Sequence, residues 1–302
     1  MCALGEKNPT VSGEIVTGKS LRELTSFRAG GTADYFITLQ DMTDLWNVFA
    51  HCDAKDIPFV VVGNGSKLLF QDEGFRGAVI KLAGEFCSTQ VEGEQLVVGA
   101  GTDLGTLLGC AVDNELAGLE FLAGIPGTVG GAVVRNAGAF GKSLSERIVS
   151  VTVLDTTTSG TKSTSVLDSG LMEFDYRTSV FLHRRELVLI EVRLQLTPDS
   201  ADKIVERVAQ ASKKKKQTQP LSYPSAGCVF KNPAHYSAGY LIQNAGCLGM
   251  RIGDAQVSYQ HGNFIINKGE ATAQDIIELM ERVKQTVKVK YGVQLEPEIE
   301  IL

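Results

Sequence analysis

The sequence has few of the features that mark nucleic-acid-binding, membrane and secreted proteins. Its 29 lysines and arginines are outnumbered by 35 aspartates and glutamates, so the net charge of −6 gives no general attraction to nucleic acid or anionic membranes. Its apolar runs are shorter than a membrane span, and Met1–Thr10 lacks the basic-then-apolar pattern of a signal peptide. We therefore expect a cytoplasmic protein that binds any polyanionic ligand at a local site, with no nucleic-acid or membrane partner.

Cysteine and histidine are too scattered to indicate disulfides or a metal centre. No CxxC pair or dense cysteine framework occurs, which favours reduced thiols in a cytoplasm. The four histidines show no HxxxH-type spacing, so we expect no metal ion.

Two nucleotide-binding motifs are also missing. Gly63-x-Gly65 lacks the third glycine of the dinucleotide fingerprint, and no GxxxxGK[ST] occurs, which disfavours Rossmann and P-loop proteins.

The chain is long enough for two or three domains, and 43% hydrophobic residues can form real cores. Apolar spacing predicts a helix over Asp41–Asp53, with Leu45, Phe49 and Cys52 on one face, and another after Thr102, its expected N-cap. Strands are predicted for four β-branched bursts: Pro58–Gly63, Gly77–Leu82, Gln95–Gly101 and Glu186–Leu196. This alternation indicates an α+β or α/β fold.

A change of composition near Pro198 indicates a C-terminal domain. It begins with an amphipathic helix, which has Ile204, Val208 and Ala211 on one face and ends in four lysines. A strand with turns at its ends is expected over His261–Gly269. The last helix is expected to start at the N-cap Thr272, with Asp275 three residues on, and to end at Gly292. Its apolar face comprises Ile276, Met280, Val283 and Val287.

Three glycine-rich segments are the strongest functional signal. Gly124–Gly141 has six glycines in eighteen residues, and Gly63–Leu69 and Arg28–Phe36 have the same character. Loops without Cβ atoms present backbone N–H groups to oxyanions, whereas the structural alternative is a set of tight turns. Three such loops together favour a long phosphate-bearing ligand.

Six motifs resemble one family. They are "LTSFRAGGTADYF", "GNGSKLL", "GIPGTVGGAVVRNAGAFG", "FDYRTS", "QPLSYPSAGCVFKNP" and "GVQLEPEI". In this order they resemble the MurB family of UDP-N-acetylenolpyruvoylglucosamine reductases, in its shorter second class, which acts in peptidoglycan precursor synthesis. The resemblance implies a vanillyl-alcohol-oxidase-type (PCMH-type) FAD-binding domain in two subdomains, 1–82 and 83–199, and an α+β substrate-binding domain, 200–302.

The resemblance places non-covalently bound FAD along the glycines, with the pyrophosphate near Gly63–Leu69 and the flavin beside Gly124–Gly141. Backbone amides there can donate to phosphate and flavin oxygens, and a flat ring can lie on a chain without side chains. Asn136 either orients its loop or bonds the cofactor. The expected FAD-binding residues are Gly63, Asn64, Gly65, Ser66, Lys67, Leu68, Gly124, Ile125, Pro126, Gly127, Gly130, Gly131, Asn136, Gly138 and Ala139.

Lys67 and Arg135 depart from the family pattern, which usually has Asn and Met at these places. Either side chain could reach phosphate or face solvent, and we favour solvent for both.

The implied reaction takes a hydride from NADPH through FAD to C3 of an enolpyruvyl ether. The resulting negative charge on C2 and the carboxylate needs cationic groups or donors, and then a proton at C2. Arg177 matches the carboxylate-binding role, although an ion pair with Asp175 or Glu173 is the structural alternative. Glu298 matches the family's active-site glutamate, for which we predict a raised pKa.

Cys228 stands where the family usually has a serine proton donor. A thiol is a stronger acid than an alcohol and is still mostly neutral at pH 7, so the substitution keeps the role. A buried spectator thiol is the alternative. We take Cys2, Cys52, Cys87, Cys110 and Cys247 as spectators.

The substrate's UDP diphosphate needs local cations. Lys216 is our choice from the lysine run, and a solvated helix end is the alternative. Lys231, Asn232 and Tyr223 are further substrate-binding candidates. NADPH is implied to use the substrate's site in alternation, and a monomer is expected.

Two rival functions are a flavin oxidase of the same superfamily acting on an alcohol or sugar, and a non-catalytic nucleotide-binding protein.

Overall fold

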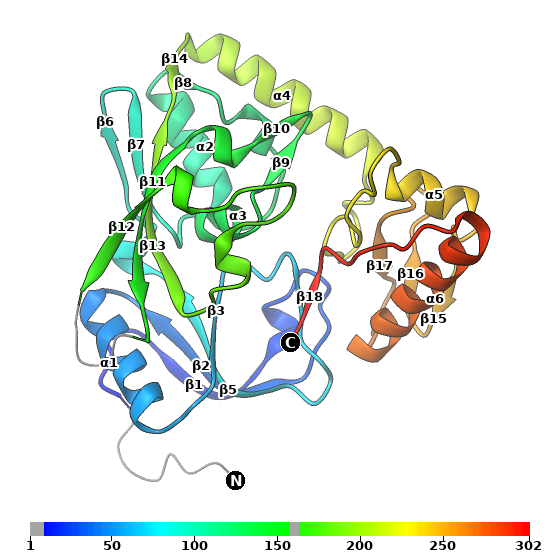
Figure 1. Cartoon of the computed structure of the whole chain (residues 1–302), viewed down its shortest axis with the longest axis horizontal. Coiled ribbons are helices and arrows are strands. Elements are labelled where there is room, and N and C mark those ends of the chain that lie inside the picture. The colour runs from blue at the N-terminus through cyan, green and yellow to red at the C-terminus, as the bar shows by residue number, and fades with distance from the viewer. Residues whose placement is uncertain (1–8, 158–162) are drawn as a thin grey trace. The chain divides into compact units, whose positions relative to one another are not determined.

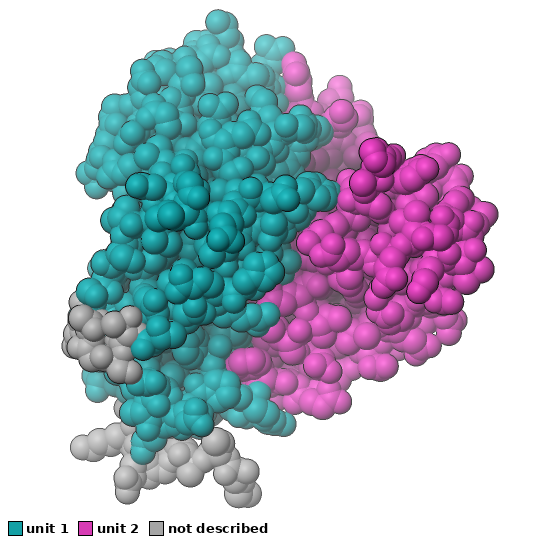
Figure 2. Space-filling model, in the orientation of Figure 1, with its two compact units in different colours: residues 1–17, 34–63, 76–209 teal, residues 18–33, 64–75, 210–302 magenta. Residues whose placement is uncertain are grey.

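The computed structural model describes residues 9–157 and 163–302, so Cys2 lies outside the described residues. The chain divides into two compact units (Figure 2). The first comprises residues up to Thr17 together with Asp34–Gly63 and Arg76–Ala209, and the second comprises Gly18–Ala33, Asn64–Phe75 and Gln210–Leu302. Each unit therefore takes segments from distant parts of the chain.

One sheet of the first unit is covered by the helix α1, Met42–Ala54. Its strands run in the order β1 (Ile15–Ser20), β2 (Thr32–Leu39), β5 (Phe75–Leu82) and β3 (Phe59–Val62). Leu45, Phe49 and Cys52 of α1 are buried, as predicted. Cys52 lines a small cavity together with Ile37 and Ala78 of the sheet, which shows the helix packed on it.

The second sheet of this unit is wholly antiparallel (Figure 1). Its order is β12 (Thr164–Asp168), β11 (Ile148–Asp155), β13 (Leu187–Gln195), β7 (Gln95–Gly99) and β6 (Thr89–Glu92). Two short pairs accompany it: β8 (Leu116–Ala117) with β14 (Thr197–Pro198), and β9 (Gly138–Ala139) with β10 (Lys142–Ser143). The four predicted strands are thus confirmed as β3, β5, β7 and β13.

Two more helices belong to this unit: α2, Leu104–Asp113, and α3, Val129–Val134. The prediction that Thr102 caps α2 is wrong, because Asp103 occupies the N-cap position. Thr102 is instead buried, its N–H donating to the Gly99 carbonyl and its carbonyl accepting from Val129. These bonds hold Thr102 in the turn before the helix.

The second unit contains α5 (Ala238–Asn244), α6 (Ala273–Tyr291) and the lysine run at the end of α4 (Ala201–Thr218). Its strands are β15 (Arg251–Ile252), β16 (Ala255–Val257) and β17 (Ile265–Asn267) in one sheet, and β4 (Leu68–Leu69) parallel to β18 (Glu300–Ile301). The ends of α6 are as predicted: Thr272 and Asp275 form a capping box, and Gly292 ends the helix at a φ of 68°. The predicted apolar face of α6 is confirmed by the burial of Ile276, Met280, Val283 and Val287. Of the face predicted for α4, Ile204 is buried, whereas Val208 and Ala211 are half-buried.

The core of the second unit draws on all three of its chain segments. Phe27, Ala29 and Leu69 are buried in the same cluster as the apolar face of α6. The three-domain division at residues 82 and 199 stays a prediction, because the compact units interleave N-terminal and C-terminal segments instead of following the chain order. Among the described residues, no helix is both long and apolar enough to cross a membrane, and no group of acidic, histidine and cysteine side chains could hold a metal ion.

Candidate functional site

The segment Gly124–Gly141 is not the bare loop that its glycines suggest, because it contains α3 and β9. The hydroxyl of Thr128 caps α3 by accepting from the Gly131 N–H at 3.3 Å. Gly130 is buried and donates its N–H to the Ala100 carbonyl at 2.8 Å. A Cβ on Gly130 would lie 3.0 Å from the Ala100 side chain, so this glycine is required by the protein's own packing.

Other parts of the same segment are accessible main chain. Gly124, Pro126, Gly131, Phe140 and Gly141 are exposed. A Cβ built on Gly141 would have no neighbour within 4 Å. A stretch of open backbone with few side chains fits a flat aromatic ligand such as a flavin. The partly buried members of the predicted set are Ile125, Gly127, Gly138 and Ala139.

Asn136 fixes the shape of this segment. Its buried amide donates to the Asp175 carbonyl at 3.0 Å, and its side-chain oxygen accepts from the Ser145 N–H at 3.1 Å. Its φ of 42° is a left-handed conformation that asparagine tolerates better than most residues. These bonds support the alternative in which Asn136 orients the loop.

Arg177 lies against the end of the glycine-rich segment. Its guanidinium donates from Nη2 to the Gly138 carbonyl at 2.7 Å and from Nη1 to the Asn136 carbonyl at 3.4 Å. Its Cζ lies 5.6 Å from the centre of the Tyr176 ring. Within the first unit, the "FDYRTS" motif and the predicted flavin segment are therefore neighbours, which the sequence order alone does not show. Arg135 of this segment is half-buried, so its exposure to solvent stays a prediction.

The other two glycine-rich segments are also partly regular structure. Arg28–Phe36 was expected to be a loop, but β2 begins at Thr32. In Gly63–Leu69 the last two residues form β4. Gly65 has a φ of 60°, and a Cβ on it would lie 1.9 Å from the Leu24 carbonyl oxygen, so close backbone approach explains this glycine without a ligand.

Lys67 does not face solvent, contrary to prediction. Its ammonium is 2.9 Å from a Glu298 carboxylate oxygen and 2.6 Å from the Cys228 carbonyl oxygen that accepts its hydrogen bond. The Lys67 side chain is 25% exposed and that of Glu298 only 6%. The buried carboxylate draws the ammonium inward, because a buried charge is costly unless it is paired. The second unit thus brings two of the three predicted catalytic residues to one lysine.

Backbone pairing places Cys228 and Glu298 on adjacent chain segments. The Glu298 N–H donates to the Val229 carbonyl at 2.8 Å, and Phe230 forms a bridge with Pro297. Cys228 is half-buried and forms a bridge with Phe264. Its thiol is therefore held on a β-like segment and is less buried than those of Cys52 and Cys247.

The predicted substrate residues also lie in the second unit. Lys216 is exposed, whereas Lys215 beside it is only 6% exposed and was missed. Burial of one lysine in a run of four has no signal in the sequence beyond its position on the helix. Lys231 pairs with Glu296 at 2.6 Å, and the Asn232 side-chain oxygen accepts from the Ala238 N–H at 3.0 Å.

Lys268 is a second cation that the sequence reasoning missed. Its ammonium donates to the Tyr223 hydroxyl at 2.8 Å and lies 4.1 Å from the centre of the ring. The contact places the Lys268 ammonium against Tyr223, a predicted substrate-binding residue. The Asn-Lys-Gly turn at the end of β17 was the available signal, because it puts a lysine at a strand end.

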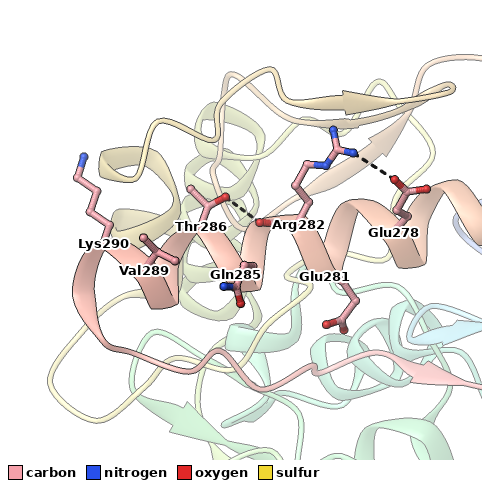
Figure 3. A pocket seen from close by; sticks show the side chains of 7 residues that line it. All are labelled: Glu278, Glu281, Arg282, Gln285, Thr286, Val289 and Lys290. Carbon is pink, nitrogen blue, oxygen red and sulfur yellow. Dashed lines mark hydrogen bonds and ion pairs between the residues drawn. The ribbon is translucent and has the colours of Figure 1, made fainter.

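A pocket elsewhere in this unit lies on α6 (Figure 3). Its lining runs from Glu278 to Lys290, with Arg282 paired to Glu278 and Thr286 bonded to the Arg282 carbonyl. The predicted site residues belong to other segments of the chain, so this pocket is separate from the candidate site.

Comparisons with known proteins agree with the motifs. A family model described as the C-terminal domain of UDP-N-acetylenolpyruvoylglucosamine reductase matches residues 219–302, and one described as an FAD binding domain matches residues 33–162. UDP-N-acetylenolpyruvoylglucosamine reductases from Caldanaerobacter subterraneus and Bacillus subtilis are 38% and 39% identical to the chain, covering 96% of it and 94% of each relative. The crystal structure of the Thermus caldophilus reductase superposes with a TM-score of 0.81 at 37% identity, covering 97% of this chain and 99% of that one.

Proposed function

Because the chain belongs to the UDP-N-acetylenolpyruvoylglucosamine reductase family, we propose that it reduces the enolpyruvyl ether of UDP-N-acetylglucosamine to UDP-N-acetylmuramate. FAD is the non-covalent cofactor and NADPH the reductant. The observation that carries the proposal is similarity to named reductases over nearly the full length of both chains. The product is a peptidoglycan precursor, so we place the enzyme in the cytoplasm, and we propose that it acts as a monomer.

When bound, FAD supplies the redox chemistry by taking a hydride from NADPH and delivering it to C3 of the enolpyruvyl ether. Gly124–Gly141 provides the open backbone seat for its ring, and Asn64–Leu68 provides backbone donors for its pyrophosphate. Asn136 keeps the first of these segments in shape through its bonds to Asp175 and Ser145.

Arg177 binds the substrate carboxylate, on which negative charge develops as C3 is reduced. Its planar guanidinium suits a carboxylate, and its bonds to the Gly138 and Asn136 carbonyls fix its position beside the flavin seat.

Cys228 completes the reaction by giving its Sγ proton to C2. A C–H bond forms at C2 as the S–H bond breaks, and the thiolate left behind regains a proton from solvent. The half-buried position of Cys228 leaves its thiol accessible, in contrast to the fully buried Cys52 and Cys247. Glu298 supports Cys228 from the neighbouring chain segment, and Lys67 balances the charge of the Glu298 carboxylate.

The uridine diphosphate is held by residues of the second unit. Lys216 remains our choice for the diphosphate, Lys231 is a second cation, and Asn232 and Tyr223 complete the set. Lys215, which is only 6% exposed, is an alternative to Lys216. NADPH uses the same site before the substrate enters, so the two half-reactions alternate.

The experiment uses Cys228→Ala with FAD bound and follows flavin absorbance. NADPH should bleach the variant at the normal rate, whereas reoxidation by the enolpyruvyl ether should slow about 10³-fold, because the proton donor is missing. Cys228→Ser should keep substantial activity. Equal reoxidation rates in Cys228→Ala and wild type would remove Cys228 from the mechanism. Fast reoxidation by O₂ would instead favour an oxidase, and flavin that NADPH cannot bleach would favour a non-catalytic protein.

A further inference from the structure

We propose that Lys67 is a positioning residue for the proton-donating half of the reaction. Its ammonium holds the Glu298 carboxylate and the main chain of Cys228 in one arrangement, and it does not serve as an FAD phosphate ligand. This inference rests on the proposed function, since it assigns Lys67 to the step in which Cys228 and Glu298 act.

The geometry of the ammonium supports this role. An ammonium carries three donors, and two of the Lys67 contacts are the Glu298 carboxylate at 2.9 Å and the Cys228 carbonyl at 2.6 Å. Gly227 lies beside the ammonium, because a Cβ built on it would be in ordinary van der Waals contact with Nζ at 3.6 Å. Gly227 also has a φ of 71°, a conformation that residues with a Cβ rarely adopt.

The lysine is anchored by the backbone at its own end. The Lys67 carbonyl accepts from the Glu300 N–H at 3.0 Å, where β4 runs parallel to β18. The segment that carries Glu298 is in turn bonded to the segment that carries Cys228, through the Glu298 N–H and the Val229 carbonyl. Lys67 therefore spans three adjacent chain segments, so its side chain limits how Cys228 can move relative to Glu298.

Two of the three departures from the family pattern, Lys67 and Cys228, meet in this contact. Lysine at 67 and cysteine at 228 replace the asparagine and serine usual in the family, and the Lys67 ammonium donates to the carbonyl of Cys228 itself. Both substitutions thus act at one place in the fold. A cation there also offsets the cost of burying the Glu298 carboxylate, whose side chain is 6% exposed.

The first test compares the two half-reactions in Lys67→Met, which keeps most of the length of the side chain and removes its charge. Reduction of bound FAD by NADPH should stay within about twofold of wild type. Reoxidation by the enolpyruvyl ether should slow about 10²-fold, as expected when reacting groups are misplaced. Lys67→Arg, which keeps the cation, should recover most of this loss. The matched control is Lys284→Met, because Lys284 is 22% exposed and pairs with Glu281 at 2.7 Å on the outside of α6.

A double-variant comparison isolates the route through Glu298. Adding Lys67→Met to Glu298→Gln should slow reoxidation by less than Lys67→Met does alone, because one of the two groups that the lysine holds is already gone. This double variant contains no unpaired buried carboxylate, so it remains informative if Lys67→Met alone folds poorly. Fully additive losses in the double variant would overturn the proposal.

A third measurement needs no turnover. FAD is titrated into the cofactor-free protein, and Lys67→Met should bind it within about twofold of wild type. A loss of about tenfold or more would show that the ammonium binds a phosphate of FAD, and would overturn the proposal. A wild-type rate of reoxidation in Lys67→Met would also overturn it. Wild-type flavin that the enolpyruvyl ether cannot reoxidise would refute the proposed function itself, so the two failures are distinguishable.

Discussion

Burial separates the cysteine that we assign to chemistry from two of the predicted spectators, Cys52 and Cys247. Cys52 is 3% exposed on the inner face of α1, and burial raises the pKa of its thiol to about 11. Burial likewise raises the pKa of the Cys247 thiol. Cys228 is half-buried on the segment that also carries the contact to Lys67. The spectator role predicted for Cys52 and Cys247 fits these environments.

We predict that Cys52 resists alkylation in the native protein. A pKa of about 11 in place of 9.0 lowers its thiolate fraction at pH 8 about a hundredfold, and only the thiolate reacts quickly. Iodoacetamide at pH 8, followed by peptide mass spectrometry, should therefore label Cys228 well before Cys52. Labelling of both at one rate in the folded protein would contradict this, and unfolding in urea should equalise them.

Single residues also show where sequence reasoning stops. Arg177, Cys228 and Glu298 could be chosen because each lies in a recognisable motif. The prediction that Lys67 faces solvent was wrong because its partner Cys228 is 161 residues away along the chain, and no local pattern records that contact. Lys215 was missed for the same reason, since its burial depends on neighbours from other segments. The turn that carries Lys268 was visible in the sequence, but its contact with the Tyr223 ring was not.

At the start of α1, the buried carboxylate of Asp44 accepts hydrogen bonds from two neighbouring chain segments. Asp44 is 2% exposed and accepts from the N–H groups of Ser12, Gly13 and Gln40 at 2.6, 3.2 and 2.9 Å, and from the Ser12 hydroxyl at 2.8 Å. Burial alone would raise the pKa of Asp44, but these hydrogen bonds outweigh it and hold the pKa below the ordinary value of 3.8.

The Asp44 contribution to stability should therefore depend on pH with a definite sign. The stabilisation is fully present above about pH 4, because the folded pKa lies below the unfolded one, and is lost as pH falls through the folded pKa. We predict that Asp44→Asn lowers the free energy of unfolding by about 2 kcal/mol at pH 7. Urea unfolding from pH 7 to pH 3 checks this. The gap between variant and wild type should narrow only below about pH 4, and a gap independent of pH would contradict the assignment.

Arg207 links the N-terminal half of α4 to Glu120 and Asp199. Its guanidinium pairs at 2.8 Å with the carboxylates of both Glu120 and Asp199, and these contacts help to hold the pKa of Glu120 below its usual range despite burial. We predict that Arg207→Met costs about 1–2 kcal/mol of unfolding free energy, a value reduced because the Arg207 side chain is 40% exposed.

Urea unfolding also measures the Arg207 effect. The control is Arg282→Met, which removes a pair between two half-exposed side chains on α6 and should cost no more than about 0.5 kcal/mol. Equal losses of unfolding free energy in the two variants would mean that the ion pair of Arg207 with the buried Glu120 carboxylate stabilises the fold no more than an exposed pair does.

Element patterns were predictable where local chemistry decides them. The capping box at Thr272 and the left-handed Gly292 identified both ends of α6. The helix α3 was missed because Gly130 and Gly131 are poor helix formers. Contacts from elsewhere, such as the Gly130 N–H to the Ala100 carbonyl, favour the helix there.

For the molecule as a whole, the second unit cannot be completed by the C-terminal third of the chain. Its core includes Phe27, which is fully buried, and Leu69, whose strand β4 pairs with β18. Asn267 also donates to the Phe27 carbonyl at 3.0 Å. The fragment 200–302 therefore lacks part of its own core and one strand partner.

We predict that the isolated fragment 200–302 does not unfold cooperatively in urea, as followed by circular dichroism. In the full chain, Phe27→Ala should lower the unfolding free energy by about 3–5 kcal/mol, because it opens a cavity in that core. A fragment with a cooperative transition as steep as its size predicts would instead support an independent domain beginning near residue 200.

The order of six motifs was enough to indicate the family, and periodicity with capping residues located most long elements, because both are written in neighbouring residues. The contact of Lys67 with Cys228 and Glu298, the packing that requires Gly65 and Gly130, and the interleaved second unit were decided by tertiary structure alone. Each joins residues far apart in the chain, and such contacts exist only after the backbone segments between them have been placed.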